Sequence, residues 1–187
     1  MWTKLYPKNV FESGKKCYFV EVSVLKQANL LKMIEFIGEY EATIDSKGRF
    51  LLPAGFKKQL PEEGGTQFVI NRGFEKCLTL YPQQSWGPIF SKISQLNDFD
   101  PKVREFRRYF LNGATQLELD SAGRILLPKN LTEHAGLDKD IVLVSAINKI
   151  EIWDKSKYTE FFETFTSQSF SDLANEVMNP KADKLNG

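Results

Sequence analysis

Short runs of alternating apolar and polar residues recur along this chain of 187 residues, and the alternation predicts half-buried β-strands. Four of these runs come in two pairs, TQFVIN and CLTLYP in the first half, then DIVLVSA and KIEIWD in the second. Each pair follows a strand–turn–strand segment and a short helical stretch, at residues 54–60 and 129–137. The pattern therefore predicts one unit of four strands, a short helix and a long helix, present twice.

Helical periodicity marks the segment that follows each unit. Between residues 99 and 114, Val103, Phe106 and Phe110 recur at i, i+3 and i+7 and predict one apolar helix face. Three arginines lie mainly off that face: Arg104, Arg107 and Arg108. Two interpretations of them stay open, a solvated helix face with local ion pairs or a surface that contacts phosphates. Four aromatic residues share a stripe near the C-terminus and indicate core or subunit packing, with base stacking as the alternative: Tyr158, Phe161, Phe162 and Phe165.

The strand–turn–strand segment is nearly copied 75 positions later. Residues 38–53 (GEYEATIDSKGRFLLP) and 113–128 (GATQLELDSAGRILLP) are identical at 8 of 16 positions. Most of the identities fall in the motif Asp-Ser-x-Gly-Arg-x-Leu-Leu-Pro, which contains residue types with special backbone or charge properties. A repeat of this kind predicts two copies of one supersecondary unit.

The motif itself predicts a tight turn, because Asp and Ser bond to neighbouring backbone groups and glycine adopts a positive φ without steric cost. Two interpretations of its charged residues stay open. In the structural one, Asp45 and Asp120 cap their turns and pair with the arginines four residues later, at about 0–1 kcal/mol per exposed pair. In the functional one, the arginines bind a phosphate or a guanine.

Nucleic-acid binding is the favoured interpretation of the first arginine. Lys47 and Arg49 flank Gly48, and a glycine allows the backbone to approach a ligand closely. Arg124 is a weaker candidate, since Ala122 stands where the first copy has Lys47. The residues predicted to contact DNA are Ser46, Lys47, Gly48, Arg49, Ser121 and Arg124, and those predicted to build the turns are Asp45, Asp120 and Gly123.

Composition and charge narrow the range of functions. With 42% apolar residues the chain can bury a core, and its formal net charge of +1 means that nucleic acid must be bound by local positive charge. The longest apolar run near the start, at residues 17–25, has about nine residues against the roughly 20 needed to span a bilayer. No signal peptide is visible.

Candidate chemistry is sparse. Cys17, Cys77 and the single histidine, His134, are widely separated in the sequence, and we find no nucleophile–base pair, metal-ligand cluster or Walker-type loop. We therefore predict a reduced, cytoplasmic protein that is not an enzyme and that uses no cofactor, metal, membrane or small-molecule substrate.

These motifs resemble those of the MraZ family of bacterial proteins. The resemblance rests on GEYEATIDSKGRFLLP, REFRRYFLNGATQLELDSAGRILLP and NKIEIWD, and it covers about residues 33–165. It implies a mainly β fold with α-helices (α+β), in which two tandem AbrB-like repeats form an intrachain pseudo-dimeric swapped-hairpin barrel with flanking helices. It also implies a ring-shaped homo-oligomer at the nucleoid. Such a ring binds double-stranded DNA at repeated promoter boxes upstream of the division and cell-wall gene cluster and regulates transcription.

The predicted organisation has four parts. Residues 1–32 are an N-terminal extension or a misassigned start, because chains of the MraZ family usually begin near Met33. Residues 33–111 are the first AbrB-like repeat with its linking helix, residues 112–165 are the second with its C-terminal helix, and residues 166–187 are a C-terminal tail. The alternative function is an oligomeric structural or protein-interaction scaffold that does not bind DNA.

Overall fold

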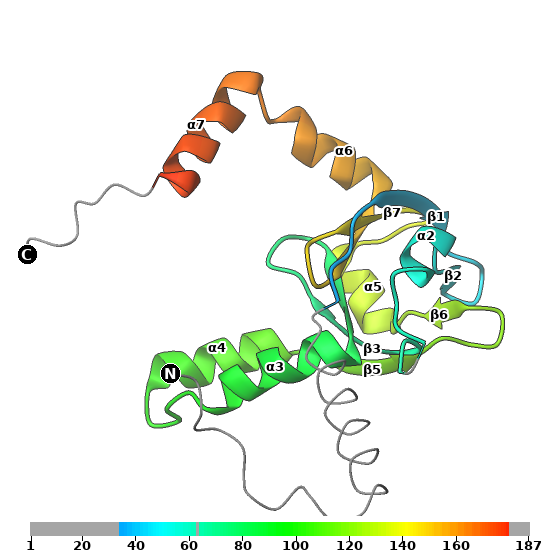
Figure 1. Ribbon diagram of the computed structural model, residues 1–187, viewed down its shortest axis with the longest axis horizontal. Coiled ribbons are helices and arrows are strands. Elements are labelled where there is room, and N and C mark those ends of the chain that lie inside the picture. The colour runs from blue at the N-terminus through cyan, green and yellow to red at the C-terminus, as the bar shows by residue number, and fades with distance from the viewer. Residues whose placement is uncertain (1–33, 63, 180–187) are drawn as a thin grey trace, which may run out of the picture.

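The computed structural model describes residues 34–62 and 64–179, so the predicted extension at residues 1–32 lies outside the described residues. This part of the chain contains eight strands and six helices (Figure 1). The strands are β1 (Glu39–Thr43), β2 (Arg49–Leu51), β3 (Gln67–Arg72), β4 (Leu78–Pro82), β5 (Thr115–Glu118), β6 (Arg124–Leu126), β7 (Asp140–Ser145) and β8 (Ile150–Asp154). The helices are α2 (Ala54–Lys57), α3 (Gln83–Ser94), α4 (Pro101–Leu111), α5 (Lys129–Ala135), α6 (Lys155–Glu163) and α7 (Ser167–Met178).

Six strands form one antiparallel sheet in the order β1-β7-β8-β4-β3-β5. The edge strands are exchanged between the repeats, since β1 of the first repeat pairs with β7 of the second and β5 of the second pairs with β3 of the first. The last strands of the two repeats, β4 and β8, pair at the centre. The sheet therefore has an internal pseudo-two-fold relation, and the predicted swapped arrangement of two repeats is confirmed.

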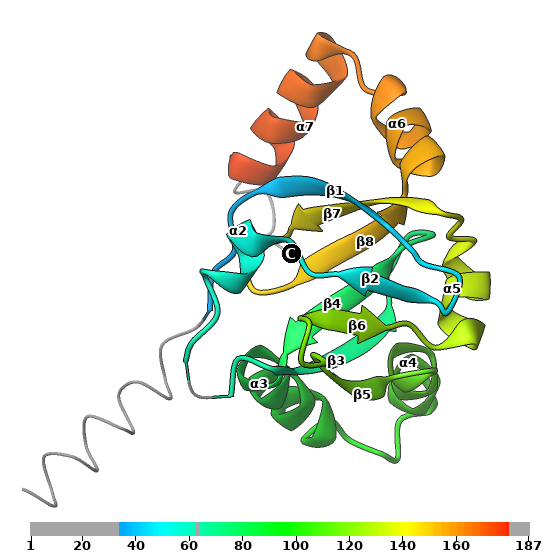
Figure 2. The same ribbon diagram turned by 90° about the vertical axis from the view of Figure 1, so that its right-hand side faces the viewer.

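The other two strands, β2 and β6, form an antiparallel ribbon that lies over the six-stranded sheet (Figure 2). Phe50 and Ile125 oppose each other at the middle of this ribbon, and both are buried. Because side chains alternate between the two faces of a strand, the residues on either side of Phe50 and Ile125 point away from the core. The ribbon and the sheet together enclose the interior of the barrel.

Both repeats contribute to one continuous core inside the barrel. Burying a large apolar side chain contributes roughly 1.5–3 kcal/mol, so this shared core dominates the stability of both repeats. Twelve of its largest side chains are fully buried: Phe50, Leu52, Phe56, Phe68, Ile70, Leu78, Leu80, Ile125, Leu131, Ile141, Leu143 and Ile150.

Short helices follow the two strands of the ribbon, each beginning after the proline of the motif. Helix α2 is shorter than the predicted stretch at residues 54–60. Helix α5 ends at Gly136, whose left-handed conformation (φ 57°) favours glycine. Lys157 from α6 donates from Nζ to the carbonyls of Ala135 and Gly136 at 2.8 and 2.7 Å, which satisfies the open end of α5.

Helices α3 and α4 form an antiparallel pair beside the sheet (Figure 1). The rings of Trp86 in α3 and Phe110 in α4 stack with centroids 5.7 Å apart, and Trp86 also packs on Val69 and Tyr81 of the sheet. Phe110 of the predicted apolar face therefore packs against α3 and the sheet, whereas Phe106 of the same face stays 41% exposed.

Two of the three arginines on α4 hold the loop between these helices. Arg107 donates to the carbonyls of Ile93 and Leu96 at 3.0 and 2.6 Å and pairs with the carboxylate of Asp98. Arg104 donates to the carbonyl of Asp98 at 2.7 Å. These contacts agree with the local-pairing alternative for both side chains.

The C-terminal aromatic stripe ends at the connection between two helices, with Tyr158, Phe161 and Phe162 in α6 and Phe165 in the connection to α7. Helix α6 ends at Glu163, and α7 begins after Thr166, which forms a capping box with Ser169. Helix α7 occupies most of the stretch that we predicted as a C-terminal tail. No helix within the described residues is long and apolar enough to cross a membrane.

Candidate nucleic-acid interface

The first turn, residues 45–48, is organised by the carboxylate of Asp45. Its Oδ1 accepts hydrogen bonds from the backbone N–H groups of Lys47 and Arg49, both at 2.9 Å. Its Oδ2 accepts from Nε and Nη2 of Arg49 at 2.9 and 2.7 Å. Gly48 adopts a φ of 79°, which other residue types rarely adopt. Asp45 thus makes the contacts that the structural interpretation predicts, because it caps the turn and binds Arg49.

The second turn, residues 120–123, repeats this arrangement with one difference. Asp120 Oδ1 accepts from the backbone N–H groups of Ala122 and Arg124, both at 2.9 Å. Its Oδ2 accepts only from Nε of Arg124, at 2.8 Å. Gly123 again has a positive φ, of 76°. The second arginine is therefore held by one guanidinium nitrogen where the first is held by two.

Both aspartates are stabilised in their charged form. The side-chain and backbone hydrogen bonds from Arg49 lower the pKa of Asp45 to about 2. The backbone hydrogen bond from Arg124, followed by its side-chain hydrogen bond, lowers the pKa of Asp120. Hydrogen bonds donated to a carboxylate favour ionisation, so each turn presents its arginine beside a carboxylate that is charged at neutral pH.

The two turns are also joined to each other. The backbone N–H of Leu52 donates to the carbonyl of Gly123 at 3.1 Å, and that of Leu127 donates to the carbonyl of Gly48 at 2.9 Å. Each glycine therefore anchors the strand that leaves the other turn. This reciprocal pair of bonds places both turns on a single ribbon.

The outward side of the ribbon forms a surface that we call the ribbon face, made of Arg49, Leu51, Arg124 and Leu126. In the β2–β6 register Arg49 opposes Leu126, and Leu51 opposes Arg124. The leucine side chains are unusually open for their type, with 54% of Leu51 and 56% of Leu126 exposed. The arginine side chains are 25% and 37% exposed. The ribbon face thus alternates two cations with two exposed apolar groups.

The structure brings all six residues that we predicted for DNA contact to this ribbon or its two turns. Ser46, Lys47 and Ser121 are exposed, while Gly48 is half-buried. Their contact with DNA stays a prediction.

Sequence reasoning missed one cation at the second turn, Lys57 of helix α2. A β-carbon placed on Gly123 would lie only 2.1 Å from Lys57 Nζ, so this ammonium group covers the second turn. Ala122 leaves the tip of that turn uncharged, and Lys57 supplies the charge from the other repeat. The corresponding position in the second repeat is Thr132. The sequence contains no local signal for this contact, because it depends on the pairing of β2 with β6.

No group of three or more His, Cys, Asp or Glu residues that could hold a metal ion occurs in the described part of the chain. Cys77, which directly precedes β4, is buried, and burial raises the pKa of its thiol to about 12.

Comparisons with known proteins show the family to which the chain belongs. The family model described as "MraZ protein, putative antitoxin-like" matches the chain twice, over residues 36–109 and 110–179. The transcriptional regulator MraZ of Christiangramia forsetii is 46% identical over 147 residues, which cover 78% of this chain and 94% of that protein. The proteins of the same name from Cytophaga hutchinsonii and Moorella thermoacetica are 44% and 42% identical, over 78% and 77% of this chain and 95% and 97% of theirs. Two matches that follow the two interlaced repeats, together with this identity over nearly the whole length of the relatives, show that the chain belongs to the MraZ family.

Proposed function

We propose that this protein is a transcriptional regulator that binds double-stranded DNA through the ribbon face. The observation that supports it most directly is a two-stranded ribbon whose outward side alternates arginine and exposed leucine. Each of its turns has a lysine nearby, Lys47 in the first turn and Lys57 beside the second. The major groove of B-DNA admits a two-stranded β-ribbon. Relatives that align over nearly their full length are named transcriptional regulators.

Each side chain of the ribbon face has a suitable partner in the groove. Arginine binds guanine O6 and N7, and apolar groups contact the thymine methyl. A guanidinium has five N–H donors, of which Asp45 takes two from Arg49 and Asp120 takes one from Arg124. The remaining donors are available to bases or phosphates, and the aspartates orient both groups in advance. Lys47 and Lys57 lie beside the turns, where lysines bind phosphates as point charges.

We further propose that the protein acts in the cytoplasm, at the nucleoid, as a ring-shaped homo-oligomer on repeated promoter boxes upstream of the division and cell-wall gene cluster. A net charge of +1 makes a single ribbon a weak DNA ligand. Several linked ribbons multiply their modest affinities through effective concentration, and tandem boxes match such an array.

The test is a titration of the full chain against DNA from upstream of its own gene and against a scrambled duplex, at low and high salt. We expect preference for the natural sequence and a steep loss of affinity with salt, because each phosphate contact releases counterions. The Lys47→Ala/Arg49→Ala variant should lose at least tenfold in affinity while its oligomeric mass stays unchanged. The matched control, Lys92→Ala/Lys102→Ala, removes two exposed cations from α3 and α4 and should bind normally.

Two results would contradict the proposal. Absence of binding at low salt by an intact oligomer would favour the alternative, a scaffold that does not bind DNA. Collapse of the oligomer in the Lys47→Ala/Arg49→Ala variant would assign the first turn to assembly.

A further inference from the structure

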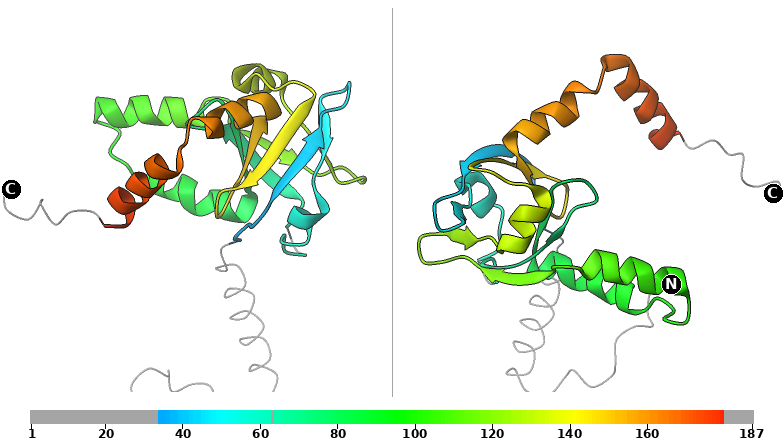
Figure 3. Two further views of the ribbon diagram at one scale, coloured as in Figure 1. Left: turned by 90° about the horizontal axis from the view of Figure 1, so that it is seen from above. Right: turned by 180° about the vertical axis from the view of Figure 1, so that it is seen from behind.

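A cavity of about 370 Å³ lies beside the barrel, between the six-stranded sheet, α4, α5 and the loop that joins β3 to β4. Figure 3 shows the α3–α4 pair extending from one side of the barrel, and the cavity lies where α4 meets the sheet. Its volume falls in the range of roughly 300–1,000 Å³ that is typical of small-molecule sites. None of the described residues that line it belongs to the ribbon face or to the two turns.

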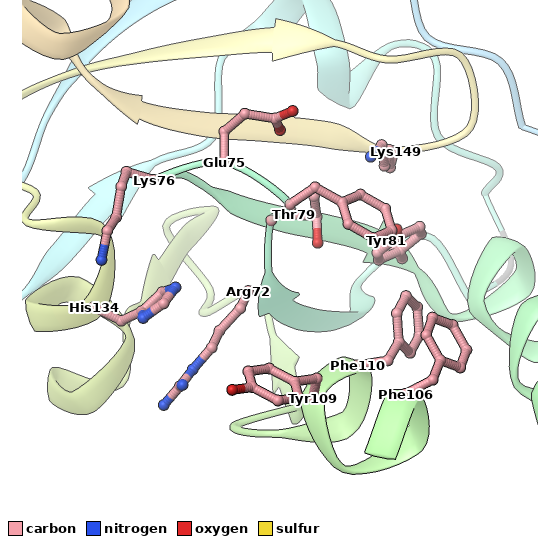
Figure 4. Close-up of a pocket in the computed structure, with 12 residues that line it drawn as sticks. Arg72, Glu75, Lys76, Thr79, Tyr81, Phe106, Tyr109, Phe110, His134 and Lys149 are labelled. Carbon is pink, nitrogen blue, oxygen red and sulfur yellow. The ribbon is translucent and has the colours of Figure 1, made fainter. Parts of the chain in front are cut away.

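The side chains around this cavity are separated by their chemistry. Figure 4 places Arg72, Lys76 and His134 at one end, which we call the cationic end, and the aromatic rings at the other. The aromatic end consists of Tyr81, Phe106, Tyr109 and Phe110. Tyr109 is 74% exposed, so the cavity is open to solvent beside this ring.

The cationic end has little negative charge to balance it. Glu75 is the one acid among the described residues that line the cavity, and Figure 4 shows its carboxylate pointing away from Arg72 and Lys76. Neither Arg72 nor Lys76 forms an ion pair within the described part of the chain, and Arg72 Nε is buried there with no hydrogen-bond partner. Burial, and then the charges of Arg72 and Lys76, lower the pKa of His134. This end therefore favours an anion.

The aromatic end is held in place before any ligand arrives. The rings of Phe106 and Phe110 stack with centroids 5.7 Å apart, and Phe110 stacks in turn on Trp86. Asn71 Nδ2 donates to the carbonyl of Phe110 at 2.5 Å, which ties α4 to β3. A planar ligand ring thus meets a preformed aromatic wall, and preorganisation of this kind lowers the entropic cost of binding.

The second repeat shows that the fold itself does not require these cations. Arg72 is the last residue of β3, and the last residue of β7 is Ser145, whose hydroxyl accepts a backbone hydrogen bond at 3.1 Å. His134 lies 75 positions after Gln59, whose side-chain amide bonds to both backbone groups of Ile37. Ser145 and Gln59 hold the barrel together, whereas Arg72 and His134 line the cavity.

We propose that this cavity binds a mononucleotide, with the base against the aromatic end and the phosphate on Arg72, Lys76 and His134. A phosphate group has a charge of about −1.5 to −2 at pH 7 and three acceptor oxygens, which suit three neighbouring donors better than a singly charged carboxylate does. Stacking on aromatic rings accepts every base, so the site selects the class of ligand more than the base. The inference goes beyond the proposed function and does not depend on DNA binding.

The experiment is a calorimetric titration of the untagged full chain with adenosine monophosphate (AMP) and guanosine monophosphate. Adenosine and inorganic phosphate are the matched halves of the ligand. We expect dissociation constants below about 1 mM for both nucleotides and affinities at least about tenfold weaker for each half, because each half contacts only one end of the cavity. Phosphate that binds as tightly as AMP would overturn the aromatic part of the proposal, and adenosine that does so would overturn the cationic part. Absence of nucleotide binding would overturn both.

Two variants test the two ends of the cavity. Arg72→Gln and Tyr109→Ala should each weaken AMP binding at least about tenfold, since each removes one set of contacts. Tyr109 is largely exposed, so its variant should melt like the wild type. Lys92→Ala removes an exposed cation from α3 and should bind AMP normally. Wild-type affinity for AMP in both cavity variants would exclude the cavity as the site.

His134 provides a further measurement because it is the single histidine of the chain. Its ring signals in an NMR pH titration can therefore be assigned without ambiguity. A phosphate beside the imidazole favours the protonated ring, so saturation with AMP should raise the pKa of His134. A pKa that AMP leaves unchanged would contradict the placement of the phosphate.

DNA titrations keep this inference distinct from the proposed function. Arg72→Gln should keep its DNA affinity within about twofold of the wild type, since Arg72 lies outside the ribbon face. Lys47→Ala/Arg49→Ala should lose DNA and still bind AMP normally. Loss of AMP binding in that variant would place the nucleotide on the ribbon face and overturn the inference. A chain that binds AMP in the cavity but binds no DNA would contradict only the proposed function.

Discussion

The two repeats of this protein share one turn and differ in what surrounds it. Asp45 and Asp120 accept the same backbone hydrogen bonds at the same distance of 2.9 Å, and Gly48 and Gly123 have nearly the same φ. At the periphery the likeness ends, because α4 packs beside α3 whereas α7 projects from the barrel. The turns that connect the repeats are alike, and the helix pairs at the periphery differ.

The same contrast applies to charge. The first turn bears its lysine at the tip, Lys47, and the second has Ala122 there. Lys57 from the first repeat covers the second turn, so both turns have one lysine and one arginine nearby. Two repeats with unequal sequences thus each have a lysine and an arginine at their turn.

The largest expected effect tests whether the repeats are one folding unit. Phe50→Ala and Ile125→Ala remove the two opposed side chains of the ribbon, and each should lower the free energy of unfolding by roughly 2–5 kcal/mol. Urea denaturation followed by circular dichroism would measure this as one transition shifted to lower urea. Two separate transitions, with only the mutated repeat weakened, would show that the repeats fold independently.

A smaller effect tests the equivalence of the two lysines. Lys47→Ala and Lys57→Ala should each weaken DNA binding several-fold and reduce the slope of log affinity against log salt by about 1, because each removes one phosphate contact. Fluorescence anisotropy across a salt series would measure both slopes.

The matched control for Lys57 is Lys58→Ala, since Lys58 is exposed on the adjacent position. Ala122→Lys in the Lys57→Ala background should restore the slope. A normal slope in Lys57→Ala would remove this residue from the interface.

The smallest expected effect is on how the stability of the fold depends on pH in the acidic range. The folded pKa of Asp45, about 2, lies below its ordinary value of 3.8, so its contribution to stability is complete above pH 3.8. It declines as the pH falls and is lost as the pH passes through about 2. Asp45→Asn should therefore be less stable than the wild type at pH 7, and the difference should shrink toward pH 2.

Thermal melting of both proteins between pH 7 and pH 2 would measure this convergence. Glu62→Gln removes one exposed carboxylate elsewhere and serves as the control. A difference between wild type and Asp45→Asn that stays constant over this range would contradict the assignment.

Much of the architecture could be predicted from the chain. Alternation over residues 140–146 and 149–154 predicted β7 and β8 to within one residue at their ends, and the family resemblance predicted the exchange of strands. The start of a second C-terminal helix, α7, after α6 escaped prediction, although the capping box of Thr166 and Ser169 is a local signal for it. A Ser at the third helical position is a weak form of that signal, since Glu or Gln is more usual there.

The candidate site could be predicted only in part. Asp45 and Arg49 are four residues apart, so their pairing follows from local geometry. The opposition of Arg49 to Leu126 joins residues from different repeats, and no local pattern contains it. The open cavity beside α4 likewise depends on how α4, α5 and the sheet meet.

The sequence by itself determined the turns, the strand alternation and the family, because glycine conformation, Asp–Arg spacing and a period of two act over a few residues. Only the tertiary structure decided that Lys57 would lie over the second turn, that two arginines and two leucines would share one face, and that α7 would bury none of its residues. Each of these depends on which segments meet across the barrel. That choice is made by the burial of Phe50, Ile125 and the shared core, and not by any neighbour along the chain.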